Sequence, residues 1–125
     1  QLATSMINDY KKLQVWGKAM DLVVAIYDIT KNFPSDEKFG LTSQIRRAAV
    51  SMPSNIAEGK MRGGDVEFKR FLFIAFASGA ELETQIDIAK RISETSKINY
   101  SKVDILLSET MKMLNSLIKK LDASS

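Results

Sequence analysis

The sequence has no cysteine and no histidine among its 125 residues. Without cysteine the chain has no disulfide framework and no thiol nucleophile. Without histidine it lacks the usual general base of a catalytic triad and the Glu-x-x-His ligand pairs of di-iron helical bundles. Most familiar catalytic and metal-binding classes are therefore excluded, and we expect a protein that is not an enzyme and has no cofactor.

Long apolar runs are missing as well. No stretch reaches the roughly 18 uncharged apolar residues that cross a bilayer, and residues 1–12 lack the apolar segment of a signal peptide. We therefore expect a cytoplasmic protein without a membrane partner. Neither sign of charge is in large excess, because 18 Lys and Arg residues oppose 15 Asp and Glu residues for a net charge of +3. This balance permits an anionic partner but falls short of a strongly basic nucleic-acid binder.

Helical periodicity is what the sequence does have. Apolar residues recur every three or four positions in four segments, at about 10–33, 42–61, 65–93 and 102–121. The connections between them are short, and no segment alternates as a strand does. The length predicts a single domain, residues 1–125. We expect an all-α, up-down-up-down four-helix bundle.

The two prolines and a glycine pair mark the breaks in this pattern. Pro34 ends the first helix, because a residue before proline is disfavoured in the α region. Pro53 lies inside the second helix and predicts either a kink there or two shorter helices in line. Gly63 and Gly64 separate the second helix from the third, with Gly64 as the N-cap and Glu67 three residues later in the capping-box position.

Residues 71–80 are uncharged and apolar or small, and on a helix they cover every side. Phe73 and Phe76 then lie well away from the direction of Phe68 and Phe71. An outer apolar face has to be covered either by another subunit or by an enlarged core of the same chain. We favour self-association into a homo-oligomer, with Phe73 and Phe76 at the interface. The alternative is a central helix enclosed by its own chain.

Basic residues gather around the turn between the second and third helices, and two more follow each other in the second helix. Arg46 and Arg47 lie off the apolar stripe of that helix, so we expect them to face solvent. Guanidinium groups match phosphate geometry, and the first backbone N–H groups of a helix bind anions. The candidate residues for binding RNA or DNA are Arg46, Arg47, Lys60, Arg62, Lys69 and Arg70. The alternative is a solvated surface, because Asp65 and Glu67 already bring negative charge to the helix start.

The carboxylates do not form a recognisable site. Glu81 and Glu83 are two residues apart and point to nearly opposite sides of a helix, so they are not an acid–base pair. Glu58 can meet one of them across the bundle, but carboxylates alone would hold at most a weakly bound Mg²⁺. Asn55 and Gln85 are expected to form hydrogen bonds at the edge of the core. We predict no catalytic residue and no metal ligand.

A series of motifs carries a resemblance to a known family over about residues 10–92. The motifs are Trp16-Gly17-Lys18-Ala19 through Ile26-Tyr27, Phe33-Pro34 with Glu37, Phe39-Gly40-Leu41, Gln44-Ile45-Arg46-Arg47-Ala48, Ser54-Asn55-Ile56-Ala57-Glu58-Gly59, and Phe68 to Ala75 followed by Ser78 and Glu81-Leu82-Glu83-Thr84-Gln85. In this order they strongly resemble the bacterial four-helix-bundle proteins, a family that includes proteins encoded in intervening sequences of large-subunit ribosomal RNA.

The resemblance implies a cytosolic helical bundle that assembles into a ring or barrel, commonly a pentamer, without established catalytic activity. A related branch, the accessory variability determinant of diversity-generating retroelements, uses a similar basic barrel to bind a reverse transcriptase and nucleic acid. By this resemblance Arg46, Arg47 and Arg62 are positions for phosphate contact, and Asn55 and Glu58 are structural.

Two functions remain open from the sequence. The leading hypothesis is a non-enzymatic, oligomeric module that binds RNA or a nucleic-acid complex through a diffuse basic surface. The alternative is an adaptor or scaffold that binds a protein partner, in which the basic residues only keep the assembly in solution.

Overall fold

The computed structural model describes residues 9–37 and 40–123, so parts of the predicted domain 1–125 lie outside the described residues. The described residues contain four α-helices and no strand, which confirms the all-α four-helix bundle. The elements are the 3₁₀ turn η1 (Asp9–Lys12), α2 (Gln14–Thr30), the 3₁₀ turn η2 (Ser35–Glu37), α3 (Leu41–Met61), α4 (Asp65–Arg91) and α5 (Ser101–Ala123).

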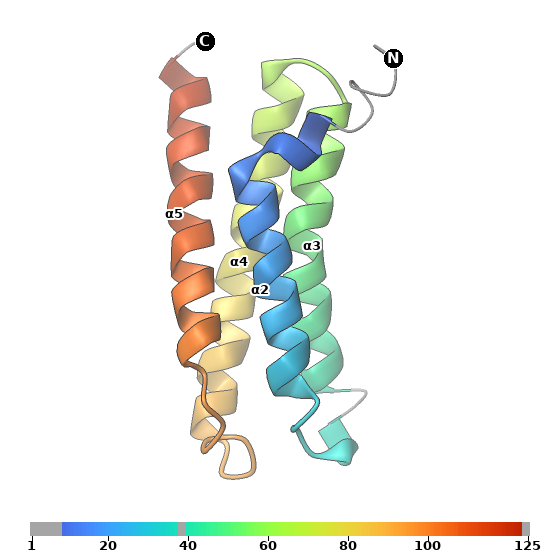
Figure 1. Cartoon of the computed structure of the whole chain (residues 1–125), viewed down its shortest axis with the longest axis vertical. Helices are drawn as coiled ribbons and strands as arrows, with labels where there is room; N and C mark the ends of the chain where they lie inside the picture. The colour runs from blue at the N-terminus through green and yellow to red at the C-terminus, as the bar shows by residue number, and fades with distance from the viewer. Residues whose placement is uncertain (1–8, 38–39, 124–125) are drawn as a thin grey trace.

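The helices run up and down beside one another (Figure 1). Helix α3 packs on α2 and most extensively on α4, and α5 closes the bundle against both α4 and α2. We call the end that holds the α3–α4 turn and the start of α2 the open end, at the top of Figure 1. The other end holds η2 and the α4–α5 connection, residues 92–100, and we call it the sealed end.

One hydrophobic core runs along the bundle axis. Leu22 of α2, Ile45 and Met52 of α3, Leu72 of α4 and Leu114 of α5 are all fully buried. Each helix contributes one apolar stripe, as the three-to-four-residue spacing predicts. The core therefore fixes which face of each helix remains for binding.

The first helix is shorter than the sequence predicts, since α2 covers Gln14–Thr30 where we expected about 10–33. Leu13 takes an extended conformation ahead of the helix, and η1 crosses from α2 towards α3 (Figure 1). In this position the Tyr10 ring packs edge-on against Trp16, with 5.5 Å between ring centres. These contacts outweigh the helical periodicity, which continues through residue 10. At the other end Phe33 leaves the helix and is buried in the core.

Helix α3 continues without interruption through Pro53, so the expectation of two shorter helices is wrong. Pro53 is itself buried. The proline removes the backbone donor for the Ala49 carbonyl, and packing of its buried ring holds the helix together there. In the same turn, the Asn55 side chain donates a hydrogen bond of 2.8 Å to the backbone oxygen of Ser51.

The α3–α4 turn is built on two glycines with φ angles of 80° and 86°, at Gly63 and Gly64. Residues other than glycine rarely adopt a positive φ angle, so the two glycines allow the tight reversal. Gly64 is the N-cap of α4, as predicted. Glu67 is engaged by Arg70, whose Nε donates a hydrogen bond of 3.1 Å to its carboxylate. The reversal places the last turn of α3 beside the first turns of α4.

Candidate nucleic-acid interface

Four of the six predicted basic residues come together at the α3–α4 turn. Arg62 is the C-cap of α3, and Arg70 follows in the second turn of α4. Their guanidinium carbons lie 5.0 and 4.6 Å from the centre of the same Phe71 ring. Phe71 is only 6% exposed, so the two guanidinium groups cover a buried ring. We call Lys60, Arg62, Lys69 and Arg70 the turn cluster.

The two arginines of the turn cluster each have a carboxylate partner. Arg62 donates to Glu58 at 2.8 Å, and Arg70 donates to Glu67 at 3.1 Å. The hydrogen bond to Glu58 raises the pKa of Arg62 above its ordinary value, so the group stays charged. Both ion pairs are exposed to solvent, and an exposed ion pair contributes only about 0–1 kcal/mol to the stability of a protein. An incoming phosphate can therefore replace these carboxylates at little cost.

The two lysines of the turn cluster bridge to other parts of the chain. Lys60 lies 3.5 Å from a carboxylate oxygen of Asp9 in η1, and its Nζ is 5.5 Å from the centre of the Phe68 ring. Lys69 lies 2.7 Å from Asp122 near the end of α5. These ion pairs link η1 to α3 and the end of α5 to α4. The turn cluster is thus a set of cations already balanced in part by nearby acids.

Arg46 and Arg47 lie apart from the turn cluster. Arg46 is half-buried: its Nε donates a hydrogen bond of 2.8 Å to Thr30 Oγ1, and its guanidinium carbon is 4.4 Å from the centre of the Tyr27 ring. The expectation that Arg46 faces solvent is therefore wrong, because α2 packs over it. Arg47 is exposed and forms no ion pair with any described residue. The 15 helical positions from Arg47 to Arg62 correspond to about 22 Å.

The open end contains further basic residues that the sequence analysis did not single out. The halves of the helices nearest this end, residues 9–22, 51–78 and 112–123, contain ten basic and six acidic residues. The rest of the sequence contains eight basic and nine acidic residues. A count of charges helix by helix does not show this asymmetry, because each helix of the bundle runs from one end to the other. The additional cations are Lys11, Lys12, Lys18, Lys112, Lys119 and Lys120.

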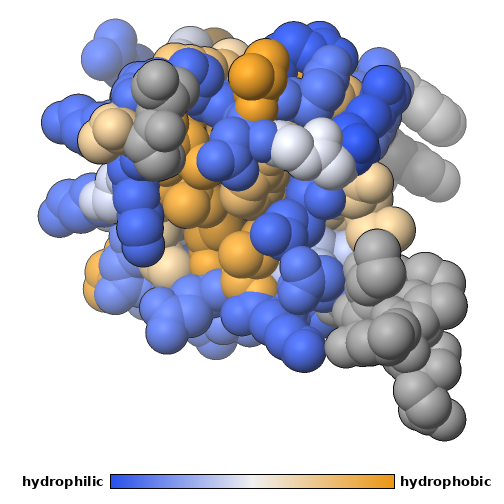
Figure 2. Space-filling view, turned by 90° about the horizontal axis from the view of Figure 1, so that it is seen from above, coloured by the Kyte–Doolittle hydropathy of each residue, from blue (hydrophilic) through white to orange (hydrophobic). Residues whose placement is uncertain are grey.

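Seen from above, the open end has an apolar centre surrounded by hydrophilic side chains (Figure 2). Part of this centre is a hollow of about 470 Å³ between the start of α2 and the second half of α5. The turn cluster lies on α3 and α4, outside the residues that line the hollow. The open end therefore has two distinct features, a cationic turn and an apolar hollow.

The two phenylalanines predicted at an interface have different surroundings. Phe73 is 51% exposed on the outer face of α4, together with Val66 and Ile88, which are 79% and 45% exposed. Phe76 is half-buried and packs against the chain's own core. Only Phe73 therefore presents an uncovered ring, within an apolar stripe along the outer face of α4.

The polar residues at the edge of the core form hydrogen bonds. Besides its bond to the Ser51 backbone, Asn55 donates to Ser51 Oγ at 2.9 Å, and Ser51 and Ser78 share a hydrogen bond of 2.8 Å between α3 and α4. Gln85 is buried and donates to Glu81 at 3.2 Å. This network joins α3 to α4 and contains no nucleophile beside a base.

Within the described ranges, no group of three or more acidic side chains is arranged to hold a metal ion. None of the helices in these ranges is long and apolar enough to cross a membrane.

A family of known proteins matches most of this chain. The model of the family described as 23S rRNA-intervening sequence protein matches residues 11–116. A comparison with individually curated proteins finds no match. The match spans all four α-helices, including the turn cluster and most of α5.

Proposed function

The chain belongs to the 23S rRNA-intervening sequence protein family, and on this premise we propose that it is a non-enzymatic bundle that binds RNA through its open end. The turn cluster supplies the phosphate contacts. The observation that carries the proposal is the pair of guanidinium groups, Arg62 and Arg70, fixed over one buried ring at the more basic end of the bundle.

The arrangement of the two arginines suits binding to the phosphate backbone of RNA. Stacking on Phe71 restricts both arginines, so less side-chain entropy is lost when they bind a phosphate. The outward faces of the guanidinium groups remain accessible, because Arg62 and Arg70 are exposed. Asp65 and Glu67 fill the first turn of α4, so the guanidinium groups, and not the helix start, would hold the phosphate.

The neighbouring acids set the expected strength of binding. Each cation of the turn cluster has a carboxylate partner, so binding exchanges one ionic contact for another. The net gain then comes mainly from the release of counterions from the RNA. We therefore propose modest affinity that weakens steeply with salt, without strong sequence preference.

The direct test measures fluorescence anisotropy of labelled single-stranded and double-stranded RNA of mixed sequence. The double variant Arg62→Gln/Arg70→Gln should bind about tenfold more weakly or worse, a loss of about 1.4 kcal/mol. The matched control is Lys97→Gln/Lys102→Gln, which removes the same charge from two exposed positions at the sealed end. Equal losses in both variants, or no measurable binding by the unchanged protein, would contradict the proposal.

Self-association is the second part of the proposal, and the exposed stripe on α4 supports it. Phe73→Glu should split the assembly, because it places a charge on a ring position that is 51% exposed and so leaves the core intact. Ile105→Glu on α5 is the control, since Ile105 is also exposed, at 60%. Multi-angle light scattering measures the mass of the assembly for the unchanged protein and for both variants. A monomer mass for the unchanged protein would contradict self-association, and equal effects of the two substitutions would contradict an interface on the outer face of α4.

A further inference from the structure

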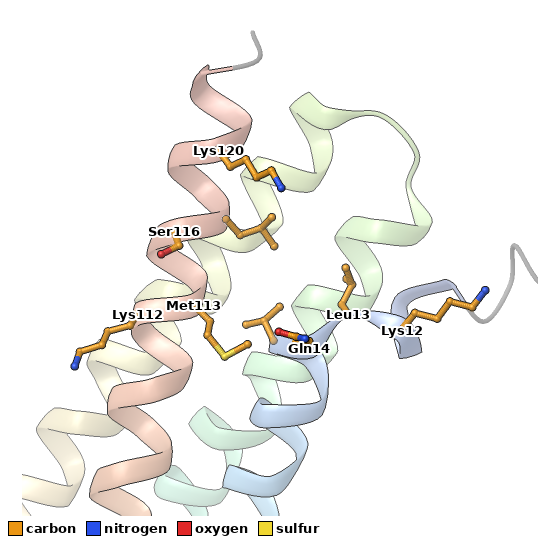
Figure 3. A pocket seen from close by; sticks show the side chains of 9 residues that line it. Lys12, Leu13, Gln14, Lys112, Met113, Ser116 and Lys120 are labelled. Carbon is orange, nitrogen blue, oxygen red and sulfur yellow. The ribbon is translucent and has the colours of Figure 1, made fainter.

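The hollow at the open end results from the late start of α2, at Gln14. Because α2 begins only at Gln14 and η1 crosses to α3, the first residues of α2 and the second half of α5 line an open hollow. Figure 3 shows the second half of α5 beside the first residues of α2 with the hollow between them. A first helix that began near residue 10 would have covered this part of α5.

Two stripes of α5 line the hollow. Met113 and Leu117 are one helical turn apart and provide the apolar floor, together with Val15 of α2 and Leu13 just before it. Lys112 and Lys120 are eight residues apart on the adjacent stripe, a separation of about 12 Å or just over two turns. The apolar and cationic stripes therefore run side by side along the helix.

Charge in the lining has a single sign. Of the nine described residues that line the hollow, three are lysines and none is acidic. Figure 3 shows Lys120 reaching over the hollow, while Lys12 and Lys112 extend to solvent on opposite sides of it. Neither Lys12 nor Lys112 forms an ion pair with any described residue. A second apolar groove lies between α2 and α3, and the described residues that line it are all uncharged: Tyr10, Trp16, Met20, Val23, Val50, Pro53, Ser54 and Ala57.

The shape favours a helix over a small molecule. Small-molecule sites enclose most of their ligand, whereas this hollow of about 470 Å³ opens widely to solvent along one helix. An amphipathic helix places its apolar face in such a groove and leaves its other side in water. Its polar edge would then lie against the lysines.

We propose that the α2–α5 hollow is a docking site for an acidic amphipathic helix of a partner protein. The partner helix places leucine-like side chains on Met113 and Leu117. Its acidic residues, spaced eight positions apart along one edge, pair with Lys112 and Lys120. This site uses different residues from the turn cluster and stands independently of the RNA-binding proposal.

The test uses two designed helical peptides that share an apolar stripe. One has Glu along the edge of the stripe at positions i, i+4 and i+8, and the other has Lys at the same positions. By fluorescence anisotropy, the Glu peptide should bind the full chain at least tenfold more tightly than the Lys peptide. In the variant Lys112→Glu/Lys120→Glu this preference should reverse, because the charges of the two surfaces are exchanged.

Three controls keep the outcome decisive. Met113→Glu places a charge on the apolar floor and should abolish binding of the Glu peptide, with circular dichroism confirming helix content. Lys97→Glu/Lys102→Glu alters the sealed end and should leave binding unchanged. Arg62→Gln/Arg70→Gln should also bind the peptide normally, even if RNA binding is lost. Equal affinity for the two peptides, no binding, or an unchanged preference after the charge reversal overturns the proposal. So does a change in subunit number caused by the charge reversal, since a second copy would then occupy the hollow.

Discussion

The two ends of the bundle are closed in different ways. At the sealed end the α4–α5 connection folds back into the core: Tyr100 is 5% exposed and donates a hydrogen bond of 2.8 Å to the backbone oxygen of Thr95. The Thr95 hydroxyl, 1% exposed, donates in turn to the backbone oxygen of Ala89 at 2.6 Å. Buried polar groups that are paired in this way stabilise a single arrangement of the chain.

The open end has no comparable seal. Its turn contains two glycines, Gly63 and Gly64, and among the described residues the arginines of the turn cluster pair with exposed acids. The apolar floor formed by Met113 and Leu117 stays partly accessible. The sealed end is thus held by buried, paired polar groups, whereas the open end presents exposed charges and a partly accessible apolar floor. We expect stability to be concentrated at the sealed end.

The largest effect is expected at the sealed end. Tyr100→Ala removes a buried ring together with its hydrogen bond, so it should lower the free energy of unfolding by about 3–5 kcal/mol. Urea denaturation followed by circular dichroism measures this loss. Leu117→Ala at the open end is the comparison and should cost clearly less, because Leu117 is only half-buried. Equal losses would mean that the open end is as tightly packed as the sealed end.

Two separate substitutions, at Gly59 in α3 and at Gly17 in α2, test how closely α3 and α4 approach near the open end. A Cβ atom at Gly59 would lie 2.5 Å from the Cβ atom of Phe71, so Gly59→Ala should destabilise the protein by about 1–3 kcal/mol. At Gly17 a Cβ atom would meet no other atom within 4 Å. Gly17→Ala should therefore stabilise α2, by about 1 kcal/mol or less. Thermal unfolding of both variants checks the opposite signs, and a stabilising Gly59→Ala would contradict the close contact.

Tyr100 also predicts a dependence on alkaline pH. Burial raises the pKa of its hydroxyl above the ordinary value of about 10. The unfolded chain then loses this proton at a lower pH than the folded chain, so this contribution to stability is complete below pH 10 and declines above it. Tyr100→Phe should cost about 1 kcal/mol at neutral pH and lose this part of the alkaline decline. Parallel pH profiles for the two proteins would argue against the assignment.

The smallest effect on stability is expected at the hollow. Lys112→Glu/Lys120→Glu changes exposed side chains and should shift the free energy of unfolding by no more than about 0.5 kcal/mol per site. The same variant is expected to reverse the peptide preference, so stability and binding separate here. A large loss of stability, measured by urea denaturation, would show that these lysines support the fold.

The sequence predicted the local features of the fold well. The four helices follow from the apolar period, and the turn cluster follows from Gly63-Gly64, because the cations lie within a few residues of the reversal. The end of the third helix, predicted at 93 and observed at Arg91, differs little, and α5 covers Ser101–Ala123 against a predicted 102–121.

Features that depend on distant contacts could not be predicted in this way. Thr30 and Arg46 meet only after α2 has packed on α3, and Lys69 and Asp122 are 53 residues apart. Phe73 and Phe76 look alike in the sequence, and only packing against the assembled core distinguishes the covered ring, Phe76, from the exposed one. The start of α2 depends on contacts of η1 with α3 that no local pattern records. The hollow was missed for the same reason.

The measurement that tests the central claim most directly is the salt dependence of RNA binding. The slope of log affinity against log salt concentration reports the number of phosphate contacts. The account predicts that Arg62→Gln/Arg70→Gln makes this slope shallower by about two, while Lys97→Gln/Lys102→Gln leaves it unchanged. A slope that is the same in all three proteins would contradict the claim that RNA binds at the open end.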